Sequence, residues 1–324
     1  MSLSIGQKAG WGLADMGIVV FVIVKQLLIL AFMNSFLGIP IAIAGAVTTA
    51  VLVFDIISDP IIGYFSDKTV SRFGRRAPWM LIGSVVLALA MIGLFAVPES
   101  FNINASLIWV IIFFLISTLG FTMVSIPYGA MAGEMTLDKK ERSSMTAWRM
   151  AFASLGILIG GALIPILAGD TRSGYTFATI CIAPLIILSI WFSVFFTRKT
   201  PRTLVPSQQN FSYILRLVLS NRAFITLVIL YGIMTLAIAL ITAGLPFAAM
   251  YLILDDGNSL LSGVAKGLGT LSLMFAAFVL GSIISQAMWV RLSNLYGKVA
   301  AQIIGIVCYI ALLIFIFFSL PSYN

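Results

Sequence analysis

The chain has 324 residues, of which 61% are hydrophobic and only 9% are charged, and its formal net charge is +8 with no histidine. Soluble globular domains average about 45–50% apolar and about 25% charged residues, so most of this chain is expected to lie in lipid. The absence of histidine removes the usual proton relay and metal ligand, and any ion chemistry has to rest on carboxylates, hydroxyls and carbonyl oxygens.

Apolar stretches of about 20 residues recur along the chain without the alternation of membrane β-strands, which predicts transmembrane helices. We predict nine of them in an all-α membrane protein, at residues 12–36, 41–64, 78–97, 107–131, 146–168, 175–196, 223–252, 267–290 and 299–319. Only the connection 198–222 is long and polar, with Pro201 and Pro206. It is the predicted central cytoplasmic loop between a six-helix bundle (1–197) and a C-terminal bundle of three helices (223–324).

The distribution of Lys and Arg among the loops predicts how the chain is oriented in the membrane. With the N-terminus in the cytoplasm, only Arg172 and Lys266 fall in outside loops, and the other loop Lys and Arg fall inside. We therefore expect a multi-pass protein of the bacterial inner membrane. Because the positive charge is explained by this topology, we do not expect nucleic-acid binding. The expected partners are the lipid bilayer and a small-molecule substrate. We expect no cofactor, and we expect the protein to be monomeric.

The chain also carries an internal echo. The loop after the second predicted helix contains Arg72-Phe73-Gly74-Arg75, and the loop after the eighth contains Leu295-Tyr296-Gly297-Lys298. The two loops lie six helices apart, which is the spacing that a repeat of two halves predicts.

Asp55 and Asp59 lie four residues apart inside the second predicted helix, so their carboxylates share one face. Charged groups in membrane helices normally face a cavity and a partner. This pair predicts a hard oxygen site for a coupling ion, Na⁺ or H⁺, which the hydroxyls of Ser58 and of Thr122 in the fourth helix can complete. The alternative is a structural salt bridge to Arg149.

Lys25 lies in the middle of the first predicted helix, where an unpaired ammonium is costly. At about 1.5 Å per residue, it lies within about one turn of Asp55 in depth. If both face one cavity, the ammonium occupies or weakens the cation site, and transport is proton-coupled or uncoupled. Alternatively, Lys25 extends outward or contacts another polar group. We include it with the candidate substrate-binding residues.

Two more candidates for substrate binding lie in the first and fourth helices. Asp15 can bind substrate hydroxyls, or it caps the start of the first helix. Tyr128 follows Pro127 and can supply a stacking ring near a bend, or it serves packing alone.

Two motifs resemble those of a known family. They are Asp55-x-x-Ser58-Asp59-Pro60-x-x-Gly63 running into Arg72-Phe73-Gly74-Arg75-Arg76, and Ile126-Pro127-Tyr128-Gly129-Ala130 followed by Glu134-Met135-Thr136. The chain resembles the glycoside–pentoside–hexuronide:cation symporters, the melibiose permease family of the major facilitator superfamily. The resemblance implies a major facilitator-type bundle of twelve helices, of which about nine are present.

The resemblance also implies roles for particular residues. Arg149 is similar to an arginine that shapes the substrate cavity, although it can also be a loop-facing residue that sets topology. Ser125, which we include with the candidate substrate-binding residues, and Gly129 stand where melibiose permeases carry an Asp and a stacking Trp. The cation site is thus carried over better than the galactoside site. Asp67, Arg72, Arg75 and Arg76 correspond to a gating loop that holds the two halves together on the cytoplasmic side; the alternative is a solvated loop.

The predicted function is cation-coupled symport of a sugar or related small polar solute by alternating access, without enzymatic activity. Two alternatives remain open. One is uncoupled or proton-coupled transport of a non-sugar amphipathic solute, and the other is a non-transporting, truncated remnant. Since the family has twelve helices, we expect the sequence to be truncated or fragmentary rather than a genuine nine-helix protein. The identity of the substrate, the ion and the direction of transport stay open.

Overall fold

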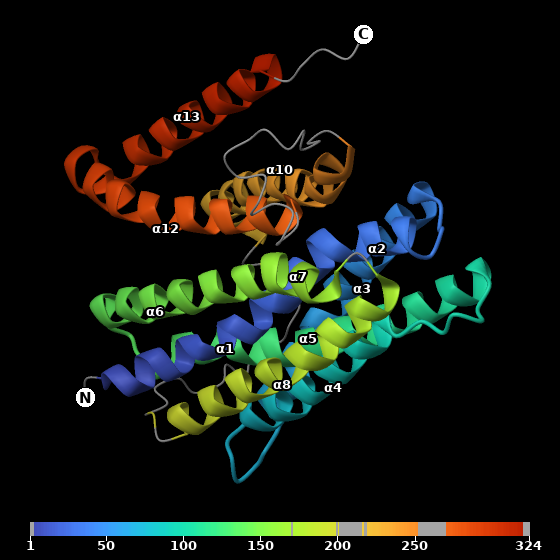
Figure 1. The fold of residues 1–324 in the computed structure, drawn as a ribbon. Helices are drawn as coiled ribbons and strands as arrows, with labels where there is room; N and C mark the ends of the chain where they lie inside the picture. Colours follow the sequence, from blue (N-terminus) through green and yellow to red (C-terminus); the bar gives the residue numbers. More distant parts are fainter. Residues whose placement is uncertain are drawn as a thin grey trace. The chain divides into compact units, whose positions relative to one another are not determined.

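The fold was obtained as a computed structural model, which describes residues 3–169, 171–198, 200, 216, 219–251 and 270–319. Every regular element in these residues is a helix (Figure 1). The elements are α1 (Ile5–Ile23), η1 (Val24–Leu28), α2 (Ile29–Ser35), α3 (Ile41–Lys68), α4 (Ala77–Phe95), α5 (Ile103–Met135), α6 (Lys139–Leu158), η2 (Ile159–Leu163), α7 (Ile164–Ala168), α8 (Arg172–Thr197), α10 (Arg222–Tyr251), α12 (Thr270–Tyr296) and α13 (Lys298–Ser319). The predicted all-α fold is confirmed.

The first six predicted spans each correspond to a helix long and apolar enough to cross a membrane. These are Ile5–Ser35, Ile41–Lys68, Ala77–Phe95, Ile103–Met135, Glu141–Ala168 and Arg172–Thr197. The three later predicted spans coincide with α10, α12 and α13 over the residues that the structure describes. α10 and α13 contain the shorter apolar helical segments Arg222–Ala237 and Val299–Phe315. The protein is an integral, multi-pass membrane protein.

Several helices extend beyond the apolar stretch that predicted them. The first begins at Ile5 rather than at residue 12, because Ser4 caps it: the Ser4 hydroxyl accepts from the backbone N–H of Gln7, and the Gln7 side chain accepts from the Ser4 N–H. This reciprocal pair satisfies two of the backbone donors that a helix start leaves free. Asp15 therefore lies well inside α1, and the interpretation of Asp15 as a helix cap is wrong.

Two compact units divide the chain, Met1–Phe275 and Ala276–Asn324. In the first, α1 packs against both α6 and α8, and α4 packs against α5 and α8 (Figure 1). The second contains most of α12 and all of α13, which approach each other where the Trp289 ring lies beside Gly305. The predicted division into a six-helix bundle, a loop and a three-helix bundle stays a prediction.

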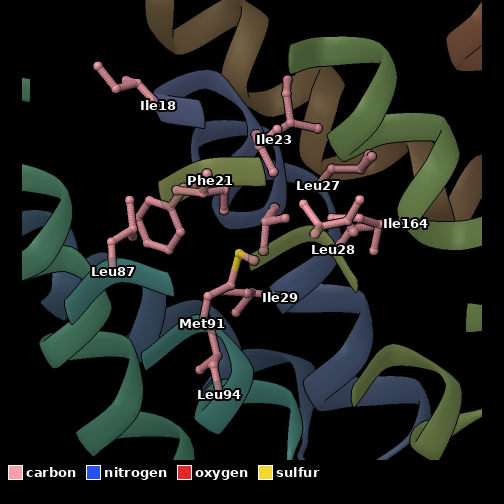
Figure 2. Close-up of a cluster of buried hydrophobic side chains, with 14 of the residues drawn as sticks. Ile18, Phe21, Ile23, Leu27, Leu28, Ile29, Leu87, Met91, Leu94 and Ile164 are labelled. Atoms are coloured by element: carbon pink, nitrogen blue, oxygen red, sulfur yellow. The ribbon is translucent and has the colours of Figure 1, made fainter. Parts of the chain in front are cut away.

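The core of the first unit surrounds the middle of the first span. Figure 2 shows side chains of α1, η1 and α2 gathered with residues of α4 and α7. The labelled residues are Ile18, Phe21, Ile23, Leu27, Leu28, Ile29, Leu87, Met91, Leu94 and Ile164. Because lipid tails are as apolar as these side chains, the helices associate here through close packing rather than through hydrophobic exclusion from water.

Glycines bring α1 and α6 unusually close together. A Cβ on Gly12 would lie 2.8 Å from the backbone nitrogen of Arg149, and one on Gly156 would lie 2.5 Å from the carbonyl oxygen of Met16. Small residues at such positions let two backbones approach each other. The contact places Asp15, one turn after Gly12, within reach of Arg149.

The two loops of the internal echo have a common backbone feature. Gly74 and Gly297 have φ angles of +94° and +82°, a region that glycine adopts without the steric cost borne by other residues. Each glycine follows an aromatic residue and precedes a cation. The similarity therefore extends from the sequence to the local conformation.

Candidate functional site

The first cluster of candidate residues begins with a break in helix geometry. Between Val24 and Leu28 the first span is a π-helical turn, η1, and Lys25 is its second residue. Wider turns of this kind inside α-helices are frequent at functional sites. The Lys25 Nζ forms an ion pair with Asp55 Oδ2 of α3. Of the alternatives for Lys25, pairing with an Asp of the second helix is thus the one observed.

Asp55 and Asp59 lie on one face of α3, and their surroundings differ. Asp59 Oδ1 accepts a hydrogen bond of 3.0 Å from the hydroxyl of Thr122 on α5. Asp55 uses Oδ2 for Lys25, whereas its Oδ1 is buried and has no hydrogen-bond partner among the described residues. The two carboxylates therefore have their polar partners on two different elements, Asp55 on η1 and Asp59 on α5.

Ser58 completes this first cluster. Its hydroxyl lies 3.5 Å from the hydroxyl of Thr122 and 3.3 Å from the carbonyl oxygen of Asp55. Ser58 and Thr122 are both buried. All four residues predicted to bind the cation, Asp55, Ser58, Asp59 and Thr122, thus lie together, and they present only oxygen atoms, which suit hard cations.

The second cluster joins α1, α5 and α6. Arg149 Nε donates a hydrogen bond of 3.1 Å to Asp15 Oδ2, and the Arg149 guanidinium lies 5.6 Å from the centre of the Tyr128 ring. The Tyr128 ring stacks on Trp11 with centroids 4.8 Å apart, and the Trp11 indole N–H donates to the Tyr128 carbonyl at 3.4 Å. The Tyr128 hydroxyl is buried without a hydrogen-bond partner in the described part of the chain.

This second cluster assigns a partner to Arg149. The proposed alternative, a structural salt bridge from Arg149 to Asp55 or Asp59, is not what the structure shows, because Arg149 pairs with Asp15. The carboxylate is almost fully buried, with 2% of its side chain exposed, whereas 40% of the Arg149 side chain is exposed. An arginine with an open face beside an aromatic ring can bind polar or anionic groups of a solute.

The remaining residues predicted to bind substrate lie apart from this cluster. Lys25 is ten residues beyond Asp15, which is about 15 Å along a helix axis, and it belongs to the first cluster. Ser125 lies half-buried on α5 between the Thr122 and Tyr128 positions. Within the described residues it joins neither cluster.

A cavity of about 190 Å³ adjoins the second cluster. It lies between α1, α5 and α6 and is lined by Trp11, Ala132, Gly133, Arg142, Met145 and Thr146. Trp11 belongs both to this cavity and to the stack on Tyr128. The sequence did not indicate this cavity.

The predicted gating loop forms a network of charges, with one exception. Arg76 Nη2 lies 3.1 Å from both Asp67 Oδ1 and Glu134 Oε1, and Arg75 Nη2 lies 2.8 Å from Glu134 Oε1. Arg72 is exposed, and its guanidinium lies over the Phe73 ring. Among the described residues the network connects α3, α4 and α5, and its predicted role in holding the two halves together stays a prediction.

Two acidic residues of these networks had no predicted role. Glu134, near the end of α5, is the shared partner of Arg75 and Arg76. Glu141, near the start of α6, accepts from the Leu3 backbone N–H at 2.7 Å and from the Thr136 hydroxyl at 2.8 Å, with Lys8 3.5 Å away. For Glu134 the available signal was an acidic side chain near the end of an otherwise apolar helix, close to basic loop residues.

Comparison with known proteins gives one family. The model of the family described as "MFS/sugar transport protein" matches residues 10–323. The putative glycoside/cation symporter YagG of Escherichia coli is 30% identical over 202 residues, 61% of this chain and 44% of the relative. The inner membrane symporter YicJ of the same organism is 28% identical over 201 residues, with the same shares.

A third relative aligns with more of the chain. The uncharacterized symporter YjmB of Bacillus subtilis is 27% identical over 316 residues, 94% of this chain and 65% of the relative. The chain thus spans less than half of the length of the first two relatives and just under two thirds of the third. The resemblance that the motifs indicated is confirmed.

Proposed function

Because the chain belongs to the MFS/sugar transport family, we propose that it is a secondary active transporter that carries a sugar or related small polar solute across the membrane by alternating access. We further propose that the first cluster is its ion site and the second its solute site. What supports this assignment is the arrangement of two separate polar clusters inside one bundle of membrane-spanning helices.

The first cluster suits a coupling cation. Intramembrane carboxylates commonly mark ion pathways in transporters, and Asp55, Asp59 and the hydroxyls of Ser58 and Thr122 gather on the contact between α3 and α5. In the proposed transport cycle, a Na⁺ or H⁺ that binds here favours the state that binds the solute. The solute and the ion then cross together.

The second cluster suits a polar solute. Asp15 fixes the orientation of the Arg149 guanidinium, and Tyr128 supplies an aromatic face beside it. Sugars are bound through hydrogen bonds to their hydroxyls and through contact of their apolar faces with aromatic rings. The relatives YagG and YicJ carry the words "glycoside/cation symporter" and "symporter" in their names, which agrees with this assignment.

A second candidate is transport without coupling to an alkali cation, either uncoupled or driven by protons. The Lys25–Asp55 ion pair favours it, because a positive charge already lies at the first cluster. The two candidates share the transport activity and differ in the ion.

The test is uptake of radiolabelled hexoses, β-glucosides and hexuronates into proteoliposomes that contain the purified protein. An imposed Na⁺ gradient, a pH gradient and no gradient are compared. We expect uptake of at least one solute above protein-free liposomes, and we expect Arg149→Ala to abolish it. Absence of uptake for the whole panel in folded, reconstituted protein would contradict the proposal.

A further inference from the structure

We propose that Lys25 is a built-in cation that takes the place of an alkali cation at the Asp55–Asp59 face. This inference rests on the proposed function, in which that face is the ion site. It makes Lys25 the residue that decides which ion the protein can use. Wild-type protein then does not bind Na⁺ or Li⁺ at this site, and removal of the Lys25 charge creates an alkali-cation site.

The position of Lys25 is fixed by the helix that carries it. The π-helical turn Val24–Leu28 lies in the middle of the first span, and the side chain reaches Asp55 from there. Only 14% of the Lys25 side chain and 18% of the Asp55 side chain are exposed. Because an unpaired ammonium at this depth is costly, the ion pair between Lys25 and the Asp55 carboxylate is strongly favoured over separated charges.

Charge counting shows what Lys25 does to the site. Asp55 and Asp59 together carry two negative charges when ionised, and Lys25 compensates one of them at contact distance. A Na⁺ entering the same face meets an ammonium, and the repulsion between two cations is strong where the effective dielectric constant is low. Without Lys25 the face carries both negative charges and attracts a cation.

The oxygen atoms needed to hold Na⁺ are present once Lys25 is removed. They are the carboxylate oxygens of Asp55 and Asp59 on one face of α3, and the hydroxyls of Ser58 and Thr122, of which Thr122 contacts Asp59 and lies 3.5 Å from Ser58. Asp55 Oδ1 is the notable atom, since it is buried and has no hydrogen-bond partner among the described residues. A buried carboxylate oxygen without a donor is a suitable ligand for a cation that displaces the lysine.

Lys25 fits this role better than solute binding. It is ten residues from Asp15, about 15 Å along the helix, whereas it is in direct contact with Asp55. Its Nζ therefore acts on the ion site and not on the cluster of Arg149 and Tyr128.

Direct binding of ²²Na⁺ to the purified full chain in detergent micelles tests the inference without knowledge of the solute. Binding is measured by equilibrium dialysis with choline chloride holding ionic strength constant. We expect no saturable binding by wild type and saturable binding by Lys25→Met and Lys25→Gln. Lys25→Arg keeps the charge, and the double variant Lys25→Met with Asp55→Asn lacks the carboxylate, so neither is expected to bind Na⁺. Lys8→Met removes another lysine of the same membrane span, Ile5–Ser35, and should behave as wild type.

Thermal unfolding gives a second readout on the same samples. A ligand that binds only the folded state raises its stability, so NaCl is expected to raise the melting temperature of Lys25→Met above its value in choline chloride. The wild type should show the same melting temperature in both salts. Lys25→Gln provides an independent variant if Lys25→Met does not fold.

Any of three binding results overturns the inference. These are saturable Na⁺ binding by wild type equal to that of Lys25→Met, binding by Lys25→Arg at the same level, or no binding by either folded neutral variant. Uptake assays separate this from the proposed function. Na⁺-stimulated uptake by wild type contradicts the inference and supports transport, whereas Na⁺ binding by Lys25→Met without uptake of any solute by any variant supports the inference and contradicts transport.

Discussion

Arg149 on α6 donates from Nε to Asp15 Oδ2 on α1 at 3.1 Å, and the two side chains differ sharply in exposure. Asp15 is nearly inaccessible, while two fifths of the Arg149 side chain is exposed. The pair is possible because Gly12 lets the two helix backbones meet beside it. The unequal exposure makes the two halves of the ion pair unequal in their importance for stability.

Removal of Arg149 should cost more stability than removal of Asp15. Arg149→Ala leaves a buried carboxylate without a counter-charge, and we expect a loss of about 3 kcal/mol. Asp15→Ala leaves an arginine that can reach water, and we expect a loss of about 1 kcal/mol. Denaturant titration in mixed micelles measures both values. The double variant should cost less than the sum of the two; equal and additive costs would contradict this account.

Arg76 should be more important than its neighbour Arg72. Arg76 has only 8% of its side chain exposed and lies 3.1 Å from both Asp67 and Glu134. Arg76→Ala removes one of the two arginine partners of Glu134, which keeps Arg75, and the partner of a largely exposed Asp67, so we expect a loss of about 1–2 kcal/mol together with slower uptake.

The control for this prediction is Arg72→Ala. Because the Arg72 guanidinium lies over the exposed Phe73 ring, outside the network, we expect a change within about 0.5 kcal/mol. Thermal unfolding of both variants side by side measures the difference. Similar losses for the two arginines would show that the network does not hold the ends of α3, α4 and α5 together.

Two threonines one turn apart on α5 offer a test of the hydrogen bond to Asp59. The Thr122 hydroxyl donates to Asp59, whereas the buried Thr118 hydroxyl oxygen has no hydrogen-bond partner among the described residues. Thr122→Val removes a donor from a charged group and should cost about 1–2 kcal/mol.

Thr118→Val should leave stability unchanged or raise it by up to about 1 kcal/mol, because it removes an unsatisfied polar group from the interior. Both substitutions exchange a hydroxyl for a methyl group, so their volumes match. The comparison is made by unfolding in micelles at one pH. A larger loss for Thr118→Val than for Thr122→Val would argue against the observed hydrogen bond.

Two glycines on α5 should also respond differently to substitution by alanine. A Cβ on Gly120 would lie 2.5 Å from the backbone nitrogen of Leu87 on α4, whereas one on Gly129 would meet nothing within 4 Å. Gly120→Ala should therefore cost about 1–3 kcal/mol through overpacking. Gly129→Ala should gain about 0.5–1 kcal/mol, since alanine is the better helix former. Equal effects in thermal unfolding would contradict the close contact of α4 and α5.

The positions of the helices followed directly from the sequence. Whether a stretch such as 78–97 crosses a membrane depends on the sum of its own side-chain transfer energies, and each apolar stretch reports that sum independently of the others. The ends were less well predicted, because caps such as Ser4 and the charged first turn of α6 lie outside the apolar stretch. The family could also be identified from the sequence, because its motifs are short and contiguous.

The cation face was predictable for a similar local reason. Asp55, Ser58 and Asp59 lie within two turns of one helix, so their common face follows from helix geometry alone. The depth of Lys25 could be counted, but its direction could not. A π-helical turn changes the rotation of one helix about its axis, and the sequence did not indicate one at Val24–Leu28. The choice between an ion pair and an outward-facing lysine therefore depended on the fold.

The sequence by itself determined that this protein lies in a membrane, where its helices are, which family it belongs to and which helix face carries the two aspartates. Only the tertiary structure decided the partners: Asp15 for Arg149, Lys25 for Asp55, and Glu134 for Arg75 and Arg76. The physical reason is range. Hydropathy and helix periodicity act within one segment, whereas an ion pair requires two helices to have the right rotation, depth and separation at once. Glycines such as Gly12 set that separation, and the contact that Gly12 makes is with Arg149, 137 residues later in the chain.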